Sequence, residues 1–288
     1  MRRASDASIA IARRLASRVV ARSAACVVAA AYLLPASAAA SGTCADGREP
    51  IYLTFDTGSQ SQAMLIHDVL KKYDVHATFF LANEKTVRGD WSLDPSWTAY
   101  WKMLASEGHA FGTHTFDHVY FRGDVEGDSG SHEVKVRPQF GARAGQAMSW
   151  NAAQYCTELD RVAHRFQGLT GQRLDALWRA PGGKTSPRLI AFASSCGYRH
   201  FGWSAAGFLG DELPSDKYPN AVLLERALHN LKSGDIVMAH LGIWSRKIQL
   251  APILDPLIAG LMARGHCFAT LREYPRERGL EPTRGHAS

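Results

Sequence analysis

The amino-acid sequence predicts an α/β fold in which about seven parallel strands and the helices between them form one closed or nearly closed barrel. From residue 49 onward, short apolar strands alternate with longer amphipathic stretches. Three of these strands end in reactive side chains, as the strands of an α/β barrel do at its active face. No interdomain linker interrupts the alternation, so we expect a single domain.

The expected elements follow from short apolar runs and from apolar residues spaced three or four apart. Strands are expected at 50–55, 76–82, 109–114, 176–180, 198–204, 235–240 and 267–271. Helices are expected at about 60–73, 95–107, 150–168, 187–196, 220–232 and 250–264. For the helix at 150–168 the sequence also offers an N-cap, Ser149, and a terminating glycine, Gly171.

Two segments lack any periodicity. Residues 119–149 are rich in glycine and mixed in charge, and so long a connection in a compact domain is usually functional or mobile. Because it starts directly after His118, we expect it to overhang the site. The polar tail at 275–288 is expected to be disordered.

The first 40 residues have the pattern of a secretory signal peptide, with an uncleaved anchor as the alternative. Six Arg and one Asp precede an Ala/Val/Leu run that ends in small residues. We therefore expect the mature domain, residues 41–274, to be exported to the periplasm or secreted. That part of the sequence contains no run of about 20 apolar residues, so we expect no integral membrane segment in the mature chain.

The net charge argues against nucleic-acid binding, and the number of cysteines predicts disulfides. Removing six Arg and one Asp lowers the net charge of +6 by five, to +1, so no electrostatic case for nucleic acid remains. Four cysteines remain, Cys44, Cys156, Cys196 and Cys267. An even number in an exported chain predicts disulfides with three possible pairings, against four buried thiols as the alternative. A closed sheet would bring residue 267 beside residue 51 and so favours Cys44–Cys267 together with Cys156–Cys196.

Three strand ends carry the candidate acid–base chemistry. Asp56 ends an apolar strand, where a general base would be shielded from water, although an Asp before Gly58 can also simply form a turn. His240 ends another apolar strand, with a purely structural role as the alternative. Arg179 ends a third, and a buried Arg needs a carboxylate partner. Asp56 is the first candidate for that partner, and Asp211, Glu212 and Asp216 are the others.

His114 and His118 are candidate metal ligands. On a helical turn, residues four apart lie on one face about 5–6 Å apart, which suits two ligands of one divalent metal. The alternative is a pair of structurally satisfied histidines. Asp117 between them is a candidate acceptor for a ligand or a helix-start carboxylate.

Together these motifs resemble the polysaccharide deacetylases, the family-four carbohydrate esterases that share the nodulation chitooligosaccharide deacetylase domain. The resemblance spans about residues 50–271 and rests on Thr54-Phe55-Asp56, His114-Thr115 with His118, Arg179 with Pro181-Gly182, Trp203 and His240. It implies a distorted (β/α) barrel and an exported hydrolase that removes acetyl groups from an N- or O-acetylated polysaccharide.

The resemblance also implies residue roles. They are Asp56 as catalytic base, Arg179 as the residue that orients it, His240 as general acid, His114 and His118 as metal ligands, and Trp203, Pro181 and Gly182 at the substrate. The implied cofactor is a divalent metal, with zinc first and cobalt or nickel as options. In the implied mechanism the metal polarises the substrate carbonyl, the base takes a proton from water, and the acid protonates the leaving amine.

The chain departs from that family at two positions. Thr57 stands where the family has a second Asp as third metal ligand, so the metal is expected to be weakly held. Gly202 stands where the family has the Asp that tunes the general acid, and a carboxylate in Gly210-Asp211-Glu212 is the expected replacement. The alternatives left open are a metal-independent hydrolase of linear amide C–N bonds and an inactive glycan-binding barrel.

Overall fold

The computed structural model describes residues 44–126 and 132–275. The signal peptide expected at 1–40 and residues 276–288 of the expected disordered tail lie outside these residues. None of the helices in the described ranges is both long enough and apolar enough to span a membrane.

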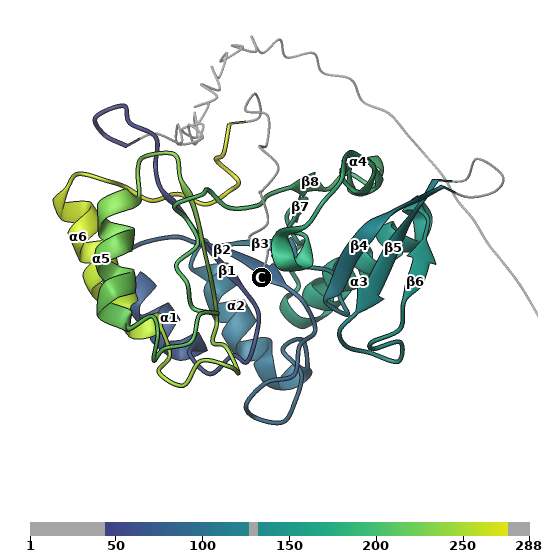
Figure 1. Cartoon of the computed structure of the whole chain (residues 1–288). Helices are drawn as coiled ribbons and strands as arrows, with labels where there is room; N and C mark the ends of the chain where they lie inside the picture. Colours follow the sequence, from purple (N-terminus) through teal and green to yellow (C-terminus); the bar gives the residue numbers. More distant parts are fainter. Residues whose placement is uncertain (1–43, 127–131, 276–288) are drawn as a thin grey trace, which may run out of the picture. The chain divides into compact units, whose positions relative to one another are not determined.

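Six parallel strands form the central sheet (Figure 1). In spatial order they are β8 (Arg199–His200), β7 (Leu177–Trp178), β3 (Ala110–Thr113), β2 (Thr78–Leu81), β1 (Tyr52–Asp56) and β9 (Ile236–His240). The side chains of β1, β2 and β3 are buried throughout, as expected for parallel strands covered on both faces. The predicted α/β class is therefore confirmed, and the sheet is a curled half-barrel.

The predicted strands at 198–204 and 267–271 are largely wrong. The first shortens to β8, and the second makes only an isolated bridge between Phe268 and Ile51. After β8 the chain runs irregularly along β9, where the backbone N–H of Met238 donates to Gly207 O at 2.8 Å. Leu209 N–H in turn donates to Met238 O at 3.2 Å, so an irregular segment extends the sheet beyond β9 and accounts for the distortion.

The six expected helices are present. They are α1 (Ala63–Lys72), α2 (Thr98–Ser106), α3 (Ala152–Thr170), α4 (Pro187–Ser195), α5 (Asn220–Asn230) and α6 (Leu254–Ala263), with short 3₁₀ turns at 95–97, 181–183 and 251–253. Five of them, α1, α2, α3, α5 and α6, contribute buried residues to a core that contains a row of stacked rings, Phe55, Phe79 and Phe111, whose centroids lie 5.6 and 5.7 Å apart. The apolar residues of α4 pack in a second cluster with Trp178.

The N-terminus of α3 differs from the prediction. Its cap is Asn151 and not Ser149, because Trp150 still belongs to a strand. Asn151 Oδ1 accepts from Gln154 N–H at 3.0 Å, and the Gln154 side chain accepts from Asn151 N–H at 2.9 Å. This reciprocal pair is a capping box. At the other end Gly171 adopts the predicted left-handed cap, with φ of 77°.

The segment expected to be an aperiodic connection is a second sheet. β4 (Val119–Glu126), β5 (His132–Pro138) and β6 (Met148–Trp150) form an antiparallel three-stranded sheet next to α3, away from α5 and α6 (Figure 1). Val134 and Val136 of β5 are buried against α3 and α4, whereas Lys135 and Arg137 are exposed. That alternation is the ordinary signal of a half-buried strand, so the sequence did contain the evidence.

Both predicted disulfides are present. Cys44 pairs with Cys267 and Cys156 with Cys196, with Cα atoms 5.5 and 6.0 Å apart. The first follows from the expected neighbourhood of the two chain segments, since Ile51 N–H donates to Cys267 O at 2.8 Å. The second joins α3 to the end of α4.

Candidate active site

One cleft gathers four of the predicted residues at the carboxyl ends of the parallel strands. Asp56 ends β1, His240 ends β9, and His114 and His118 follow β3. All four line a cleft of about 230 Å³. Their convergence follows from the topology, because parallel strands all end at the same edge of the sheet.

Asp56 is held by Arg179, the first of the partners considered from the sequence. The Arg179 guanidinium is fully buried and donates to Asp56 Oδ1 at 2.8 Å. Its other nitrogens donate to the carbonyls of Phe201 at 3.1 Å and Gly202 at 3.0 Å. Burial alone would raise the pKa of Asp56, but the guanidinium and the neighbouring imidazoles bring it below its usual value. The Asp56 carboxyl is therefore both oriented and negatively charged at neutral pH.

His114 and His118 face each other with ring centroids 4.9 Å apart. His114 Nδ1 donates to Arg179 O at 2.9 Å, which leaves Nε2 without a proton and 3.6 Å from Asp56 Oδ2. Burial lowers the pKa of both imidazoles to about 4, so both are neutral near pH 7. His118 Nδ1 is buried and has no hydrogen-bond partner among the described residues.

The turn that carries the two histidines is not helical, contrary to the expectation. Thr115 and His118 have φ of 62° and 49°, in the left-handed region that residues other than glycine seldom adopt. Thr115 Oγ1 accepts from Val119 N–H at 2.7 Å and stabilises this conformation. Asp117 plays neither of its expected roles, because it pairs with Arg161 of α3 at 2.7 Å.

The hydroxyl of Thr57, at the predicted third-ligand position, is hydrogen-bonded within the protein. It donates to Glu84 Oε1 at 2.5 Å and accepts from Ala82 N–H at 3.0 Å. Within 44–126 and 132–275, no three His, Cys, Asp or Glu side chains are arranged so that they would hold a metal ion. The residues present therefore provide part of a metal site. His114 and His118 offer two neutral imidazoles, and the buried Nδ1 of His118 has no hydrogen-bond partner among the described residues.

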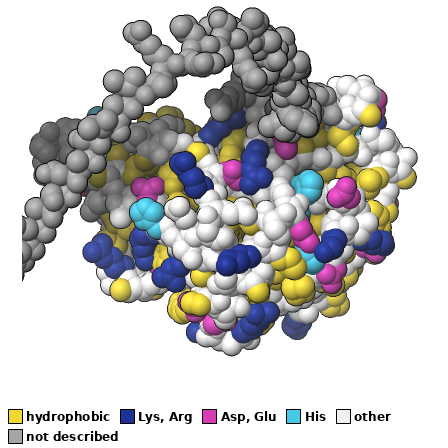
Figure 2. All heavy atoms as spheres, turned by 180° about the vertical axis from the view of Figure 1, so that it is seen from behind, with side chains coloured by type: hydrophobic (Ala, Val, Ile, Leu, Met, Phe, Trp, Pro, Cys, Tyr) yellow, Lys and Arg dark blue, Asp and Glu magenta, His cyan; other side chains and the backbone are white. Residues whose placement is uncertain are grey.

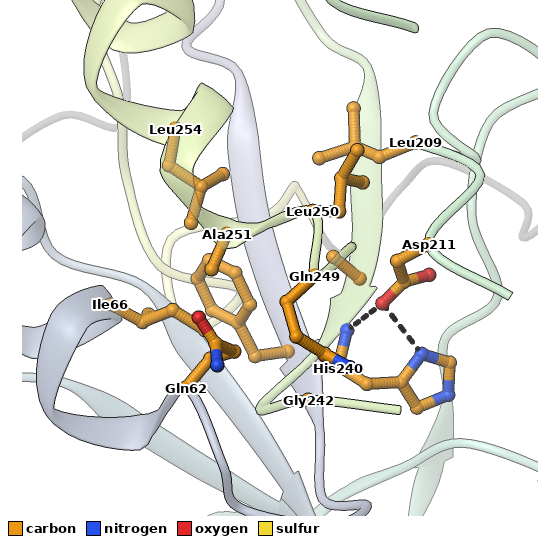
Figure 3. Close-up of a pocket in the computed structure, with 12 residues that line it drawn as sticks. Gln62, Ile66, Leu209, Asp211, His240, Gly242, Gln249, Leu250, Ala251 and Leu254 are labelled. Carbon is orange, nitrogen blue, oxygen red and sulfur yellow. Dashed lines mark hydrogen bonds and ion pairs between the residues drawn. The ribbon is translucent and has the colours of Figure 1, made fainter. Parts of the chain in front are cut away.

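His240 has a carboxylate partner that the sequence placed in the right segment. Asp211 Oδ2 accepts from the backbone N–H of His240 at 2.6 Å and from Nδ1 at 3.0 Å (Figure 3). Burial lowers the pKa of His240, but Asp211, aided by Glu212 and Asp56, raises it to about 10. The side chain is therefore an imidazolium at neutral pH. Apolar residues, among them Leu209 and Leu254, line a small pocket next to this pair (Figure 3).

Two of the three predicted substrate-binding residues line the cleft. Trp203 and Gly182 line the cleft, whereas Pro181 is buried and does not. Gly183 has φ of 70°, and a Cβ there would lie 2.5 Å from the Trp203 ring, so the indole depends on this glycine. Trp244, 62% exposed, also lines the cleft.

The sequence analysis missed several residues of the cleft. Glu84, Tyr120, Gln139 and Trp244 line it as well. Tyr120 and Gln139 belong to the segment that was expected to overhang the site, so its position was foreseen and its residues were not. Glu84 lies three residues beyond β2, and the rule that singled out Asp56 and His240 applied equally to this strand end.

Comparison with known proteins agrees with the family resemblance seen in the sequence motifs. A family model described as polysaccharide deacetylase matches residues 45–201, more than half of the chain. A peptidoglycan-N-acetylglucosamine deacetylase from Bacillus cereus is 26% identical over 229 residues, covering 78% of this chain and 88% of that protein.

Solved structures share the fold. A family 4 acetyl xylan esterase from Clostridium thermocellum, in complex with a cobalt ion, has a TM-score of 0.57 at 20% identity, covering 77% of this chain and 88% of that one. A CE4 family pseudoenzyme from Bacillus anthracis has a TM-score of 0.56 at 18% identity, covering 78% of this chain and 65% of that one. At such identities these likenesses show the fold alone.

Proposed function

The chain belongs to the polysaccharide deacetylase family, and we propose that it removes acetyl groups from an N- or O-acetylated cell-wall or exported glycan by attack of water. The observation that carries the proposal is the opposite charge state of two groups in one cleft. Arg179 keeps Asp56 charged as a base, and Asp211 keeps His240 protonated as an acid. A pair of titratable groups whose environments separate their pKa values in this way is typical of acid–base catalysis.

In the proposed reaction on an N-acetyl group, Asp56 accepts a proton from water while the water oxygen bonds to the acetyl carbonyl carbon. The C–N bond then breaks, and the nitrogen keeps the electron pair and takes the proton of His240 Nε2. Asp211 holds Nδ1 and so directs that proton into the cleft. A divalent ion bound by His114 and His118 would supply polarisation of the carbonyl oxygen. The products are acetate and a free amine.

Export is part of the proposal. The signal-peptide pattern at 1–40 and two disulfides together favour an oxidising compartment, the periplasm or the exterior. A glycan is accordingly the proposed partner. The absence of a nucleic-acid partner stays a prediction. On the face shown in Figure 2, basic and acidic side chains are interspersed.

Acetate release tests the function. We expect the mature chain to release acetate from at least one of N-acetylated chitooligosaccharides, peptidoglycan and acetylated xylan. Asp56→Ala and His240→Ala should each lower the rate of the folded enzyme about 10²-fold or more. Each also removes one partner of a buried ion pair, so the thermal midpoint should fall as well, and the rates are compared at a temperature where circular dichroism shows every variant to be folded. His229→Ala, on the exposed side of α5, is the control and should keep full activity. Full activity in His240→Ala would contradict the assignment of the acid.

A metal-independent C–N hydrolase remains the second candidate, because Thr57 provides no carboxylate and no three-residue metal cluster occurs in the described part of the chain. Release of ammonia or an amine from linear amides, undiminished by a chelator and without acetate release from any glycan, would favour it. The inactive glycan-binding barrel is the less favoured reading, since binding alone does not require a charged base and a protonated acid in one cleft.

A further inference from the structure

A buried carboxyl of the cleft remains unexplained by the acid–base pair. Glu84 is 9% exposed and lines the cleft with Asp56, His114 and His118. Among the described residues its carboxyl has one hydrogen-bond donor, the Thr57 hydroxyl, and forms no ion pair with Lys or Arg. Buried carboxylates usually have a cationic partner, because moving an ion from water into the protein interior costs several kcal/mol.

The strand register explains why Glu84 lies beside Thr57. β1 and β2 are parallel neighbours, and Thr57 N–H donates to Phe80 O at 3.1 Å. Ala82 N–H then donates to Thr57 Oγ1, so the chain beyond β2 runs past the threonine. A carboxylate from the next strand thereby reaches the place where Thr57 itself offers only a hydroxyl.

The backbone of Glu84 is held independently of its side chain. Its N–H donates to Ser92 Oγ at 3.0 Å, and its carbonyl accepts from Ser92 N–H at 2.8 Å. Three rotatable bonds separate that anchored backbone from the carboxyl group. Rotation about these bonds is the movement that would carry the carboxyl from Thr57 toward the cleft.

The partner for this carboxylate is available in the same cleft. Two neutral imidazoles face each other there, and His118 Nδ1 is an orphaned buried nitrogen. Glu84, His114 and His118 all line this cleft, so the carboxyl and the two imidazoles border the same space. Two imidazoles and one carboxylate, with positions left open for water and substrate, are the ligand set of many catalytic zinc sites.

We propose that Glu84 is the carboxylate ligand of a divalent-cation site whose imidazole ligands are His114 and His118. In the described conformation these three side chains are not arranged to hold an ion, and the Glu84 carboxyl accepts from the Thr57 hydroxyl. The proposal therefore includes a rotation of the Glu84 side chain from Thr57 toward the imidazoles when the ion binds. The proposal rests on the proposed function for the presence of a metal. It adds that the acidic ligand comes from the end of β2 and not from β1.

Zinc titration of the metal-stripped mature chain by calorimetry tests the proposal. Glu84→Gln keeps the shape of the side chain and should weaken zinc binding at least tenfold, about the cost of losing one ligand. Glu212→Gln is the matched control, a carboxyl of the same cleft that should leave the zinc affinity within about twofold. Thr57→Asp in the Glu84→Gln background should restore binding.

Cobalt provides a second readout, because its absorption spectrum reports the ligand set. The spectrum should change in Glu84→Gln and remain unchanged in Glu212→Gln. Unchanged zinc affinity in Glu84→Gln, or no zinc binding by the parent, would overturn the proposal. Acetate release measured in parallel separates the two hypotheses. Chelator-resistant acetate release would refute the Glu84 site alone, whereas Glu84-dependent zinc binding without acetate release would refute the deacetylase.

Discussion

At the scale of single residues, a neighbour of opposite charge keeps each reactive group ionised. His240 is flanked by Asp211 on both its backbone N–H and its ring, and this pair explains why burial does not neutralise the imidazole. Asp56 is in the converse position, with a guanidinium as its fixed partner. Each group is thus charged because of one neighbour, and replacing that neighbour should change its titration.

Asp211→Asn should narrow the pH range of activity. Because Asp211 raises the pKa of His240 to about 10, the parent acid remains protonated through neutral pH. Without the carboxylate, burial lowers that pKa, and the alkaline limb of the kcat profile should move down by more than about one pH unit. The KM should change little, since Asp211 bonds to His240 and the substitution does not alter Trp203, the predicted substrate-binding residue. An unchanged alkaline limb would contradict this role.

The same pair makes a prediction for stability. A histidine whose pKa rises from about 6.5 unfolded to about 10 folded stabilises the protein fully below pH 6.5, and this contribution is lost as the pH rises toward 10. Urea unfolding should show that the parent's advantage over Asp211→Asn falls by about 4 kcal/mol between pH 6 and pH 10. A constant difference between the two proteins would show that the His240 charge is not the cause.

At the scale of elements, the ends of strands and the turns after them position the site. The left-handed Thr115 and His118 lie in one such turn, and Gly182 and Gly183 lie in another, with φ of 68° and 70°. Backbone conformations of this kind cost of order 1–3 kcal/mol for most residues and are often retained at functional sites. The turn at Gly182 and Gly183 determines where the Trp203 ring can lie in the cleft.

Gly183→Ala should impair the substrate site by displacing Trp203, because the new Cβ would lie 2.5 Å from its ring. We expect kcat/KM to fall by about tenfold, with a stability loss of about 1–2 kcal/mol from the left-handed backbone. Gly197→Ala is the control, with φ of 87° and no neighbour within 4 Å of the added carbon. It should lose the same stability and keep its kcat/KM. Equal loss of activity in both variants would refute the displacement.

At the scale of the whole molecule, two disulfides close loops of very different length. Cys44–Cys267 spans 223 residues of sequence and joins the two ends of the described domain, whereas Cys156–Cys196 spans 40. The chain-entropy model relates the stabilisation by a disulfide to the length of the loop that it closes in the unfolded chain. The longer loop should therefore contribute more.

Replacing the cysteines by Ser in pairs tests this expectation. Loss of Cys44–Cys267 should lower the free energy of unfolding by about 1.5 kcal/mol more than loss of Cys156–Cys196. Urea unfolding measures the difference. Acetate release from the folded variants is the control, because neither bridge lines the cleft. A larger loss from the shorter loop would show that native packing around the bridge between α3 and α4 outweighs chain entropy.

Local patterns in the sequence were sufficient for the α/β class, the six helices and the ends of β1, β7 and β9. An apolar run followed by Asp56, Arg179 or His240 predicts a buried strand that presents a reactive group at its end, and no distant residue is needed to see this. Cys44–Cys267 was predicted from the neighbourhood of two strands, and Cys156–Cys196 from the two helices that flank the strand at 176–180. The antiparallel sheet was missed although Val134 and Val136 alternate with charged residues, because the glycines around them suggested a loop.

What only the tertiary structure decided is which groups become neighbours. Asp211 and His240 are 29 residues apart, and Thr57 and Glu84 are 27 apart. Neither pairing follows from spacing, because each depends on the register of parallel strands and on the course of the loops after them. The sequence had named Asp56 as the first candidate partner of Arg179 and had placed the carboxylate for His240 in Gly210-Asp211-Glu212. The charge state of a buried group is set by neighbours within a few ångströms, so the charges of Asp56 and His240 could be assigned only from the folded positions of Arg179 and Asp211.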